Sequence, residues 1–156
     1  MIMTNTLHTA PCMSEFKSLL KKYSLKATPQ RLAVHSAMQV LGHASADMVT
    51  EEVARQGRTK VTVASVYNIL TQLALLGIYA HRLSIGNKMY FDVNTHQHIH
   101  LYDTVNSTFM DVEDEDLTAM IEARLGKRRF RGYKVDGIDI QILCHPSKNK
   151  LMKIIR

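Results

Sequence analysis

Apolar residues recur every three or four positions through the first half of the chain, the spacing of one buried face on a helix. This pattern predicts four helices, at residues 14–23, 29–41, 46–56 and 62–77. Thr28 and Ser45 are suitable N-caps, and Pro29 suits a first helical turn because its missing N–H needs no partner there.

After residue 77 apolar and polar residues alternate, and this period of two predicts strands. A hairpin is expected at residues 78–93, with Gly86 and Asn87 in its turn. Further on, the pattern predicts strands near 101–102, 108–112, 133–136 and 138–143. Acidic residues at its start and Gly126 at its end predict a helix at 114–125. Helices followed by a hairpin are the order of a winged helix. The predicted fold class is therefore α+β, with a small α/β unit after the winged helix.

This order predicts distinct segments along the chain. They are a flexible arm (1–13), a winged-helix domain (14–93), a hinge (94–97), a small α/β domain (98–146) and a basic tail (147–156). The second domain is too small to bury much apolar surface alone. It would gain by pairing with a second copy, so a homodimer is expected.

The polar face of the fourth predicted helix, which is expected to face solvent, carries no charged residue. No charged residue occurs between Thr62 and Gly77, where an ordinary surface helix carries Lys, Glu and Arg. Short hydroxyls, amides and a tyrosine can enter a major groove and contact base edges. The base-reading candidates are Thr62, Ser65, Tyr67 and Asn68, and the candidates for phosphate contacts are Lys26, Arg31, Lys60 and Lys88. The alternative is that another element of the same protein covers this face.

Composition narrows the class of protein. The chain carries 20 Lys and Arg against 14 Asp and Glu, a net charge of +6 that suits an anionic partner such as DNA. No apolar run is long enough to span a bilayer, and the first residues do not resemble a secretory signal, so a cytoplasmic protein without a membrane partner is expected. Cys12 and Cys144 lie far apart and neither belongs to a CxxC pair, which excludes a four-cysteine structural zinc site within one chain.

Three histidines stand at alternate positions within the stretch 90–103. His96, His98 and His100 could share one face of a strand, and Asp92 lies just upstream. This arrangement favours metal or haem binding, against the alternative of an exposed polar strand with chance histidines. The chain has no glycine-rich phosphate loop and no nucleophile with a partner base, so it is not expected to be an enzyme. A metal- or haem-binding protein without a DNA-binding role is the alternative from a different class.

Three passages together resemble the ferric uptake regulator superfamily of bacterial repressors. They are LKATPQR (25–31), TVASVYNIL (62–70) and YFD…HQHIH (90–100). Asn68 after Val-Tyr, the run YFDVN and the absence of CxxC pairs look most like the iron response regulator branch. The resemblance implies a transcriptional regulator that binds an inverted-repeat DNA operator as a homodimer and controls genes of haem and iron metabolism. The alternative within the superfamily is a manganese- or peroxide-responsive repressor.

The resemblance also implies a set of metal ligands. The family's inter-domain site falls on His43, Asp92, His98 and His100 in this chain. Imidazoles with a carboxylate suit Fe²⁺ or Mn²⁺, and also Zn²⁺ in vitro. If haem is the ligand, His96, His98 and His100 are the candidates.

Two other sites known in the superfamily are expected to be missing. The cysteines of its structural zinc site would fall near Asp103, Asn106 and Cys144. The ligand positions of a second metal site would fall on Ile99, Thr118 and Ile138. The Cys-Pro haem motif of some iron response regulators is reversed here as Pro11-Cys12.

Overall fold

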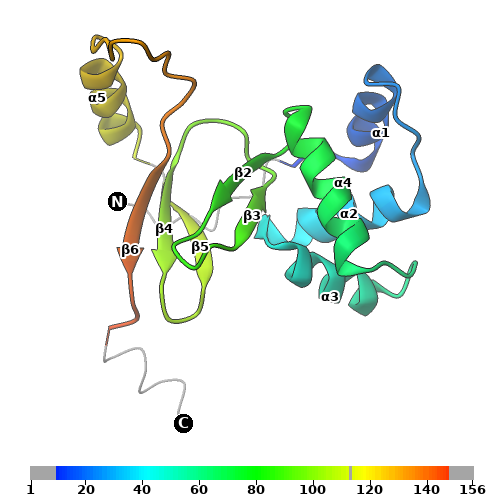
Figure 1. Ribbon diagram of the computed structural model, residues 1–156. Coiled ribbons are helices and arrows are strands. Elements are labelled where there is room, and N and C mark those ends of the chain that lie inside the picture. The colour runs from blue at the N-terminus through cyan, green and yellow to red at the C-terminus, as the bar shows by residue number, and fades with distance from the viewer. Residues whose placement is uncertain (1–9, 113, 148–156) are drawn as a thin grey trace. The chain divides into compact units, whose positions relative to one another are not determined.

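The computed structural model describes residues 10–112 and 114–147, and the chain forms two compact units, one ending at Thr95 and the other beginning at His96. The predicted α+β class is confirmed (Figure 1). Within the described ranges, no helix is long and apolar enough to cross a membrane.

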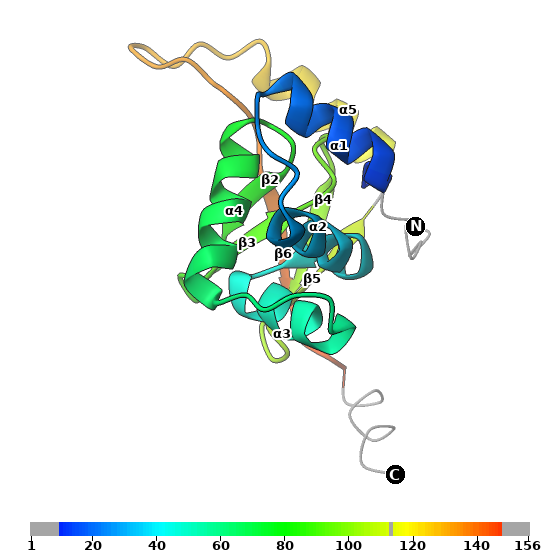
Figure 2. The ribbon, with the colours of Figure 1, turned by 90° about the vertical axis from the view of Figure 1, so that its right-hand side faces the viewer.

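The N-terminal unit contains four helices and a small sheet. In chain order its elements are α1 (Met13–Lys22), α2 (Pro29–Leu41), β1 (His43–Ala44), α3 (Ala46–Gln56), α4 (Val63–Leu75), β2 (Ala80–Leu83) and β3 (Met89–Asp92). Figure 2 shows α2, α3 and α4 of this unit, with α1 beside them. The apolar face of each helix meets the others in one core, which includes Phe16, Leu20, Val34, Met38, Val49, Val53, Leu70 and Leu73.

The helix boundaries follow from their caps. Thr28 Oγ1 accepts a hydrogen bond from the backbone N–H of Arg31 at 3.3 Å, which satisfies one unpaired donor of the first turn of α2. At the start of α4, Thr62 and Ser65 cap each other reciprocally. Ser45 precedes α3 as predicted but contributes no side-chain cap, and only its backbone carbonyl accepts from Val49 N–H.

The sheet of this unit has the order β1-β3-β2, with both neighbours of β3 antiparallel to it. The sequence predicted the hairpin of β2 and β3 but not β1, because two residues are too short to show a period. Gly42 has a φ of 70°, which lets the chain leave α2 and enter β1 at once. The short strand places His43 directly opposite Asp92.

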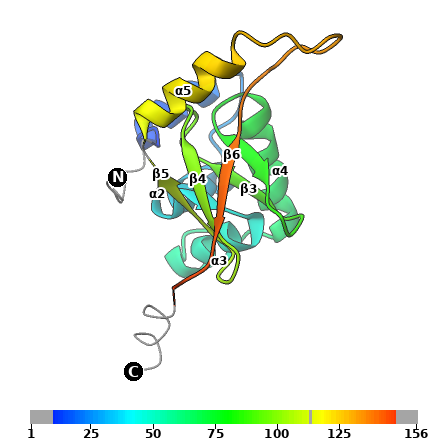
Figure 3. The same cartoon turned by 90° about the vertical axis from the view of Figure 1, so that its left-hand side faces the viewer.

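The C-terminal unit is a three-stranded sheet with one helix. It consists of β4 (Ile99–Asp103), β5 (Thr108–Val112), α5 (Glu115–Leu125) and β6 (Ile140–Cys144). Figure 3 shows β4 between β5 and β6, antiparallel to β5 and parallel to β6. The strand predicted at 133–136 is wrong: this segment belongs to an irregular connection, in which Tyr133 is 82% exposed. A turn at Gly132, whose φ is 83°, interrupts the extended chain there.

Hydrogen bonds hold the turn between β4 and β5, where the superfamily's structural zinc was expected to be missing. Asp103 Oδ1 accepts from the backbone N–H groups of Val105 (2.9 Å) and Asn106 (3.1 Å), and Oδ2 accepts from Asn106 Nδ2 (2.7 Å). The Thr104 hydroxyl and N–H both donate to the backbone carbonyl of Cys144 in β6. Polar side chains and backbone groups therefore connect the ends of all three strands.

Replacing Asp103 by Ala should lower the midpoint of thermal unfolding, because two backbone N–H groups and the Asn106 amide lose their acceptor. The hydrogen bonds from Asn106 hold the pKa of Asp103 below its usual value of 3.8. A carboxylate with a lowered pKa stabilises the fold above its unfolded pKa, and this contribution is lost as the pH falls through the folded pKa. Asp136→Ala, at an exposed position in the irregular connection, is the control. An equal midpoint in both variants would contradict this role.

A buried histidine joins the N-terminal segment to the helical core. His35 is fully buried in α2, and its ring stacks on Phe16 with centroids 3.8 Å apart. Its Nε2 donates to the carbonyl of Pro11 at 2.8 Å, so Nδ1 accepts from the Tyr79 hydroxyl at 2.7 Å. The neutral imidazole is therefore satisfied on both sides, as expected for a structural histidine.

Acidification from about pH 7.5 to about pH 5.5 should lower the free energy of unfolding through His35. Burial disfavours the imidazolium and lowers the pKa of His35 below its usual 6.5, although the bond to Pro11 acts in the opposite direction. The unfolded chain therefore takes up a proton more readily than the folded protein. The contribution of His35 is complete above the unfolded pKa and falls below it, by at most about 1.4 kcal/mol per pH unit.

Urea unfolding at the two pH values would measure this effect. His35→Phe should reduce the pH dependence, whereas His81→Gln, at an exposed histidine, should keep it. The same pH dependence in wild type and His35→Phe would show that His35 does not contribute.

Candidate functional site

The first turns of α4 present an uncharged surface to solvent. Val63 is 44% exposed and Tyr67 43% exposed, and Asn68 is exposed beside them. The Tyr67 ring meets buried Phe91 of β3 edge-on, with centroids 6.1 Å apart, which holds the tyrosine in place. Thr62 and Ser65 are engaged in the N-terminal cap, so Tyr67 and Asn68 are the predicted base-reading side chains that extend from the helix without a capping role.

The predicted phosphate-binding residues differ in their surroundings. Lys26 and Lys60 are exposed. Arg31 is half-buried, and it donates to the Lys26 carbonyl and to Gln72 Oε1, both at 2.8 Å. Arg31 thus connects α4 with the turn that precedes α2.

Lys88 follows the turn of the β2–β3 hairpin and forms an exposed ion pair with Asp47 of α3, with Nζ 2.8 Å from Oδ2. The hydrogen bond between them raises the pKa of Lys88 and lowers the pKa of Asp47. One open hollow is lined by Tyr67 and Asn68 of α4 together with Lys88, Asn87 and Leu83 of the hairpin. The fold therefore brings the uncharged face of α4 and the hairpin tip to the same surface.

The N-terminal unit pairs two of the predicted metal ligands. His43 Nε2 lies 2.8 Å from Asp92 Oδ2, and both side chains are buried. Asp92 Oδ1 accepts from the backbone N–H of Asn94 at 2.7 Å, and Arg82 Nη2 approaches Oδ2 at 3.5 Å. The carboxylate is thus oriented by the backbone that follows it, with one oxygen directed to an imidazole.

In the C-terminal unit, the other two predicted metal ligands, His98 and His100, lie beside Asp111, which was not predicted from the sequence. His98 and His100 lie on the same side of β4, with ring centroids 4.1 Å apart. Asp111 Oδ1 of β5 lies 3.1 Å from His98 Nε2 and 3.8 Å from His100 Nε2. These two histidines and Asp111 form a compact group of three donors.

Asp111 could have been found from the hairpin register. The chain reverses near residues 106 and 107, and continued pairing places Asp111 opposite His100. An aspartate within the otherwise apolar end of TFMDV was the available signal. Sequence reasoning missed it because the strands were predicted without extending their register to residue 100.

His96 lies outside the strand, because β4 begins at Ile99. Its side chain is exposed, but its backbone carbonyl accepts from His98 Nδ1 at 2.7 Å. This bond fixes the His98 tautomer, so that Nε2 carries a lone pair directed toward Asp111. A carbonyl partner on the second ring nitrogen is the usual setting of a metal-bound histidine.

These groups have the chemistry of a transition-metal site. At 3.1 Å, a lone-pair nitrogen and a carboxylate oxygen require a proton or a cation between them. Neutral imidazoles and carboxylates together suit Fe²⁺, Mn²⁺ or Zn²⁺. His43 and Asp92 supply one such pair, and His98, His100 and Asp111 supply another set.

Comparison with known proteins places the fold. The family model described as the ferric uptake regulator family matches residues 22–142. A search of curated proteins found no significant match.

Solved structures match over most of the chain. The Vibrio cholerae ferric uptake regulator is 22% identical, with a TM-score of 0.70 over 84% of this chain and 99% of its own. The Helicobacter pylori ferric uptake regulator, described with three functional metal binding sites, is 18% identical, with a TM-score of 0.66 over 94% and 97%. The Campylobacter jejuni peroxide stress regulator is 24% identical, with a TM-score of 0.58 over 86% and 98%. At these identities the likeness shows a common fold.

Proposed function

Because the chain belongs to the ferric uptake regulator family, we propose that it is a metal-responsive transcriptional regulator that binds operator DNA. The observation that carries this proposal is the pairing of imidazole and carboxylate donors in both units of a winged-helix protein. No enzymatic activity is proposed.

DNA binding is assigned to α4 and the β2–β3 hairpin. Tyr67 and Asn68 would contact base edges, and Thr62 and Ser65 would lie at the helix end nearest the groove. Lys26, Lys60 and Lys88 would contact phosphates, with Lys88 exchanging Asp47 for a phosphate oxygen. Arg31 would lie close to the DNA phosphates while its hydrogen bond to Gln72 holds α4 in place.

The sensing role is assigned to His43, Asp92, His98 and His100, with Asp111 as a fifth donor. Asp92 and His98 are six positions apart in the chain, so a fully extended linker spans at most ~20 Å between them. We infer that one ion takes donors from both units. Such an ion would fix one arrangement of the units, and its binding free energy would be linked to DNA affinity through that arrangement.

The physiological ligand is proposed to be Fe²⁺ or Mn²⁺, because the donors are nitrogen and carboxylate oxygen without thiolate. Haem at His96, His98 and His100 is the second candidate, since the chain resembles iron response regulators in Asn68 and the run YFDVN. In that case the regulated genes would belong to haem and iron metabolism. A manganese- or peroxide-responsive repressor is the alternative within the family.

A homodimer on an inverted-repeat operator is the proposed DNA-binding form. One face of the sheet in the C-terminal unit leaves apolar side chains exposed, including Met110 at 41% and Ile142 at 42%, which both lie beside Leu101. A second copy that covered them would bury apolar surface that the small unit cannot bury alone. A twofold dimer would present two copies of α4, which matches an inverted repeat.

Operator binding by the metal-free protein, titrated separately with Mn²⁺, Fe²⁺ and haem, tests the proposal. Operators would first be selected from random duplexes, and affinity would be followed by fluorescence anisotropy. A change in affinity with Mn²⁺ or Fe²⁺ supports a metal sensor, and a change with haem alone supports the haem alternative. Duplex binding that responds to none of the three would refute the sensing role.

A further inference from the structure

The irregular connection between α5 and β6 carries a cluster of cations that the regulator proposal does not use. Lys127, Arg128, Arg129, Arg131 and Lys134 are all exposed. No ion pair or side-chain hydrogen bond joins any of them to another residue in the part of the chain that the structure describes. Their charge is therefore directed to solvent or to a partner.

Two aromatic rings stand among these cations. Phe130 is 45% exposed and Tyr133 is 82% exposed, although both rings would ordinarily favour burial. Tyr133 N–H donates to the Phe130 carbonyl at 3.0 Å, which makes the two residues the ends of a β-turn. Gly132 supplies the positive φ of 83° that the turn requires. The turn thus brings the backbones of these two exposed residues together.

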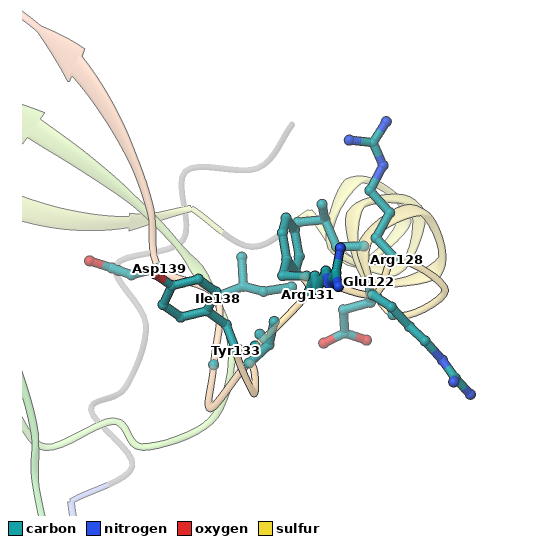
Figure 4. A pocket seen from close by; sticks show the side chains of 13 residues that line it. Glu122, Arg128, Arg131, Tyr133, Ile138 and Asp139 are labelled. Atoms are coloured by element: carbon teal, nitrogen blue, oxygen red, sulfur yellow. The ribbon is translucent and has the colours of Figure 1, made fainter.

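Phe130 and Tyr133 line one open hollow of about 930 Å³ between the end of α5 and the connection. Val135 and Ile138 add apolar surface, and Arg128, Arg129 and Arg131 also line the hollow. Figure 4 shows Arg128 extended away from Tyr133 and Ile138. Glu122 and Asp139 also line the hollow, which disfavours a phosphate within it.

This arrangement suits a planar group inside and negative charge outside. A nucleobase has a flat apolar face that stacks on aromatic rings, and its neighbouring phosphates would reach the arginines of the connection. The bases of an intact duplex are already stacked on each other, so a duplex would use the cations but not the rings. We propose that residues 127–138 form a binding site for an unpaired nucleobase with its flanking phosphates, as found in single-stranded nucleic acid.

Binding of a labelled single-stranded oligonucleotide of about twelve nucleotides to the full-length protein tests this site. Phe130→Leu/Tyr133→Leu should weaken binding by roughly tenfold or more, since stacking contributes a factor of this order per base. Tyr23→Leu, at a 38% exposed tyrosine of the other unit, should bind as wild type does. Tyr133→Leu alone repeats the test at a single exposed position, and circular dichroism checks that each variant is folded.

The arginines are tested by salt dependence. Arg128→Gln/Arg129→Gln/Arg131→Gln should reduce the slope of log affinity against log salt by about 2, whereas the corresponding triple Lys variant should keep it. Competition with adenosine 5′-monophosphate then separates the sources: displacement shows that one nucleotide suffices, and its failure shows that a chain is needed.

Two results would overturn the proposal. One is single-strand binding that is unchanged in Phe130→Leu/Tyr133→Leu. The other is an equal loss of single-strand and duplex binding in that variant, which would place the connection on a duplex backbone instead. The duplex measurement also separates this site from α4, because the regulator proposal stands whatever the rings bind.

Discussion

Replacing His98 and His100 together by Ala should abolish the response of operator binding to metal. The change removes both imidazoles of the group around Asp111, whose Oδ1 lies 3.1 Å and 3.8 Å from their Nε2 atoms. Loss of a partner that only orients a ligand lowers metal affinity by about 10- to 100-fold, so loss of two direct ligands should exceed ~100-fold. Calorimetric titration of Mn²⁺ would measure the affinity, and anisotropy with and without Mn²⁺ would measure the response.

Two variants accompany the double variant. Asp111→Asn keeps the size of the side chain but removes its charge, and should reduce Mn²⁺ affinity by an intermediate factor of roughly 10 to 100. His81→Ala removes an exposed histidine of the N-terminal unit and should leave metal affinity unchanged. If operator binding by the double variant still responds fully to Mn²⁺, His98 and His100 do not sense the metal.

Replacing Asn68 by Ala should weaken specific operator binding by roughly 1–3 kcal/mol and leave non-specific duplex binding unchanged. Asn68 is exposed on the first turns of α4, where an amide can both donate to and accept from a base edge. It carries no charge, so its loss should not alter the salt dependence that phosphate contacts produce. Anisotropy with the selected operator and with a scrambled duplex would provide both values.

Leu75→Ala is the matched control on the same helix. Leu75 is 79% exposed near the C-terminal end of α4, so truncation there should affect neither specific nor non-specific binding. If Asn68→Ala weakens both kinds of binding equally, α4 does not read bases.

Most helices and strands were predictable from the chain. The apolar spacing predicted α1 to α4, whereas an acidic start and Gly126 predicted α5. Thr28 and the reciprocal pair of Thr62 and Ser65 mark two helix starts through hydrogen bonds to the local backbone. Local chemistry decides these features, so local sequence suffices to find them. The predicted strand at 133–136 failed because this segment follows a turn that ends at Tyr133 and pairs with no neighbouring strand in the described residues.

The candidate metal site could be predicted only in part from the sequence. The alternation of His98 and His100 pointed to a shared face, and the structure places both beside one carboxylate. Asp111 was missed because its closeness to His98 depends on the register of a hairpin rather than on spacing along the chain. The strand β1, which sets His43 against Asp92, was missed because two residues carry no period.

The sequence by itself determined the α+β class, the uncharged face of α4 and the residue types able to bind a metal. These properties depend on side-chain chemistry and on the spacing of apolar residues at periods of two and 3.6, and both can be read directly from the sequence. Only the tertiary structure decided which donors meet, since hydrogen-bonded strands bring together residues far apart in sequence. It also decided that His35 is a buried structural histidine and that Phe130 and Tyr133 stand exposed among arginines, because burial is a property of the folded surroundings and not of the residue.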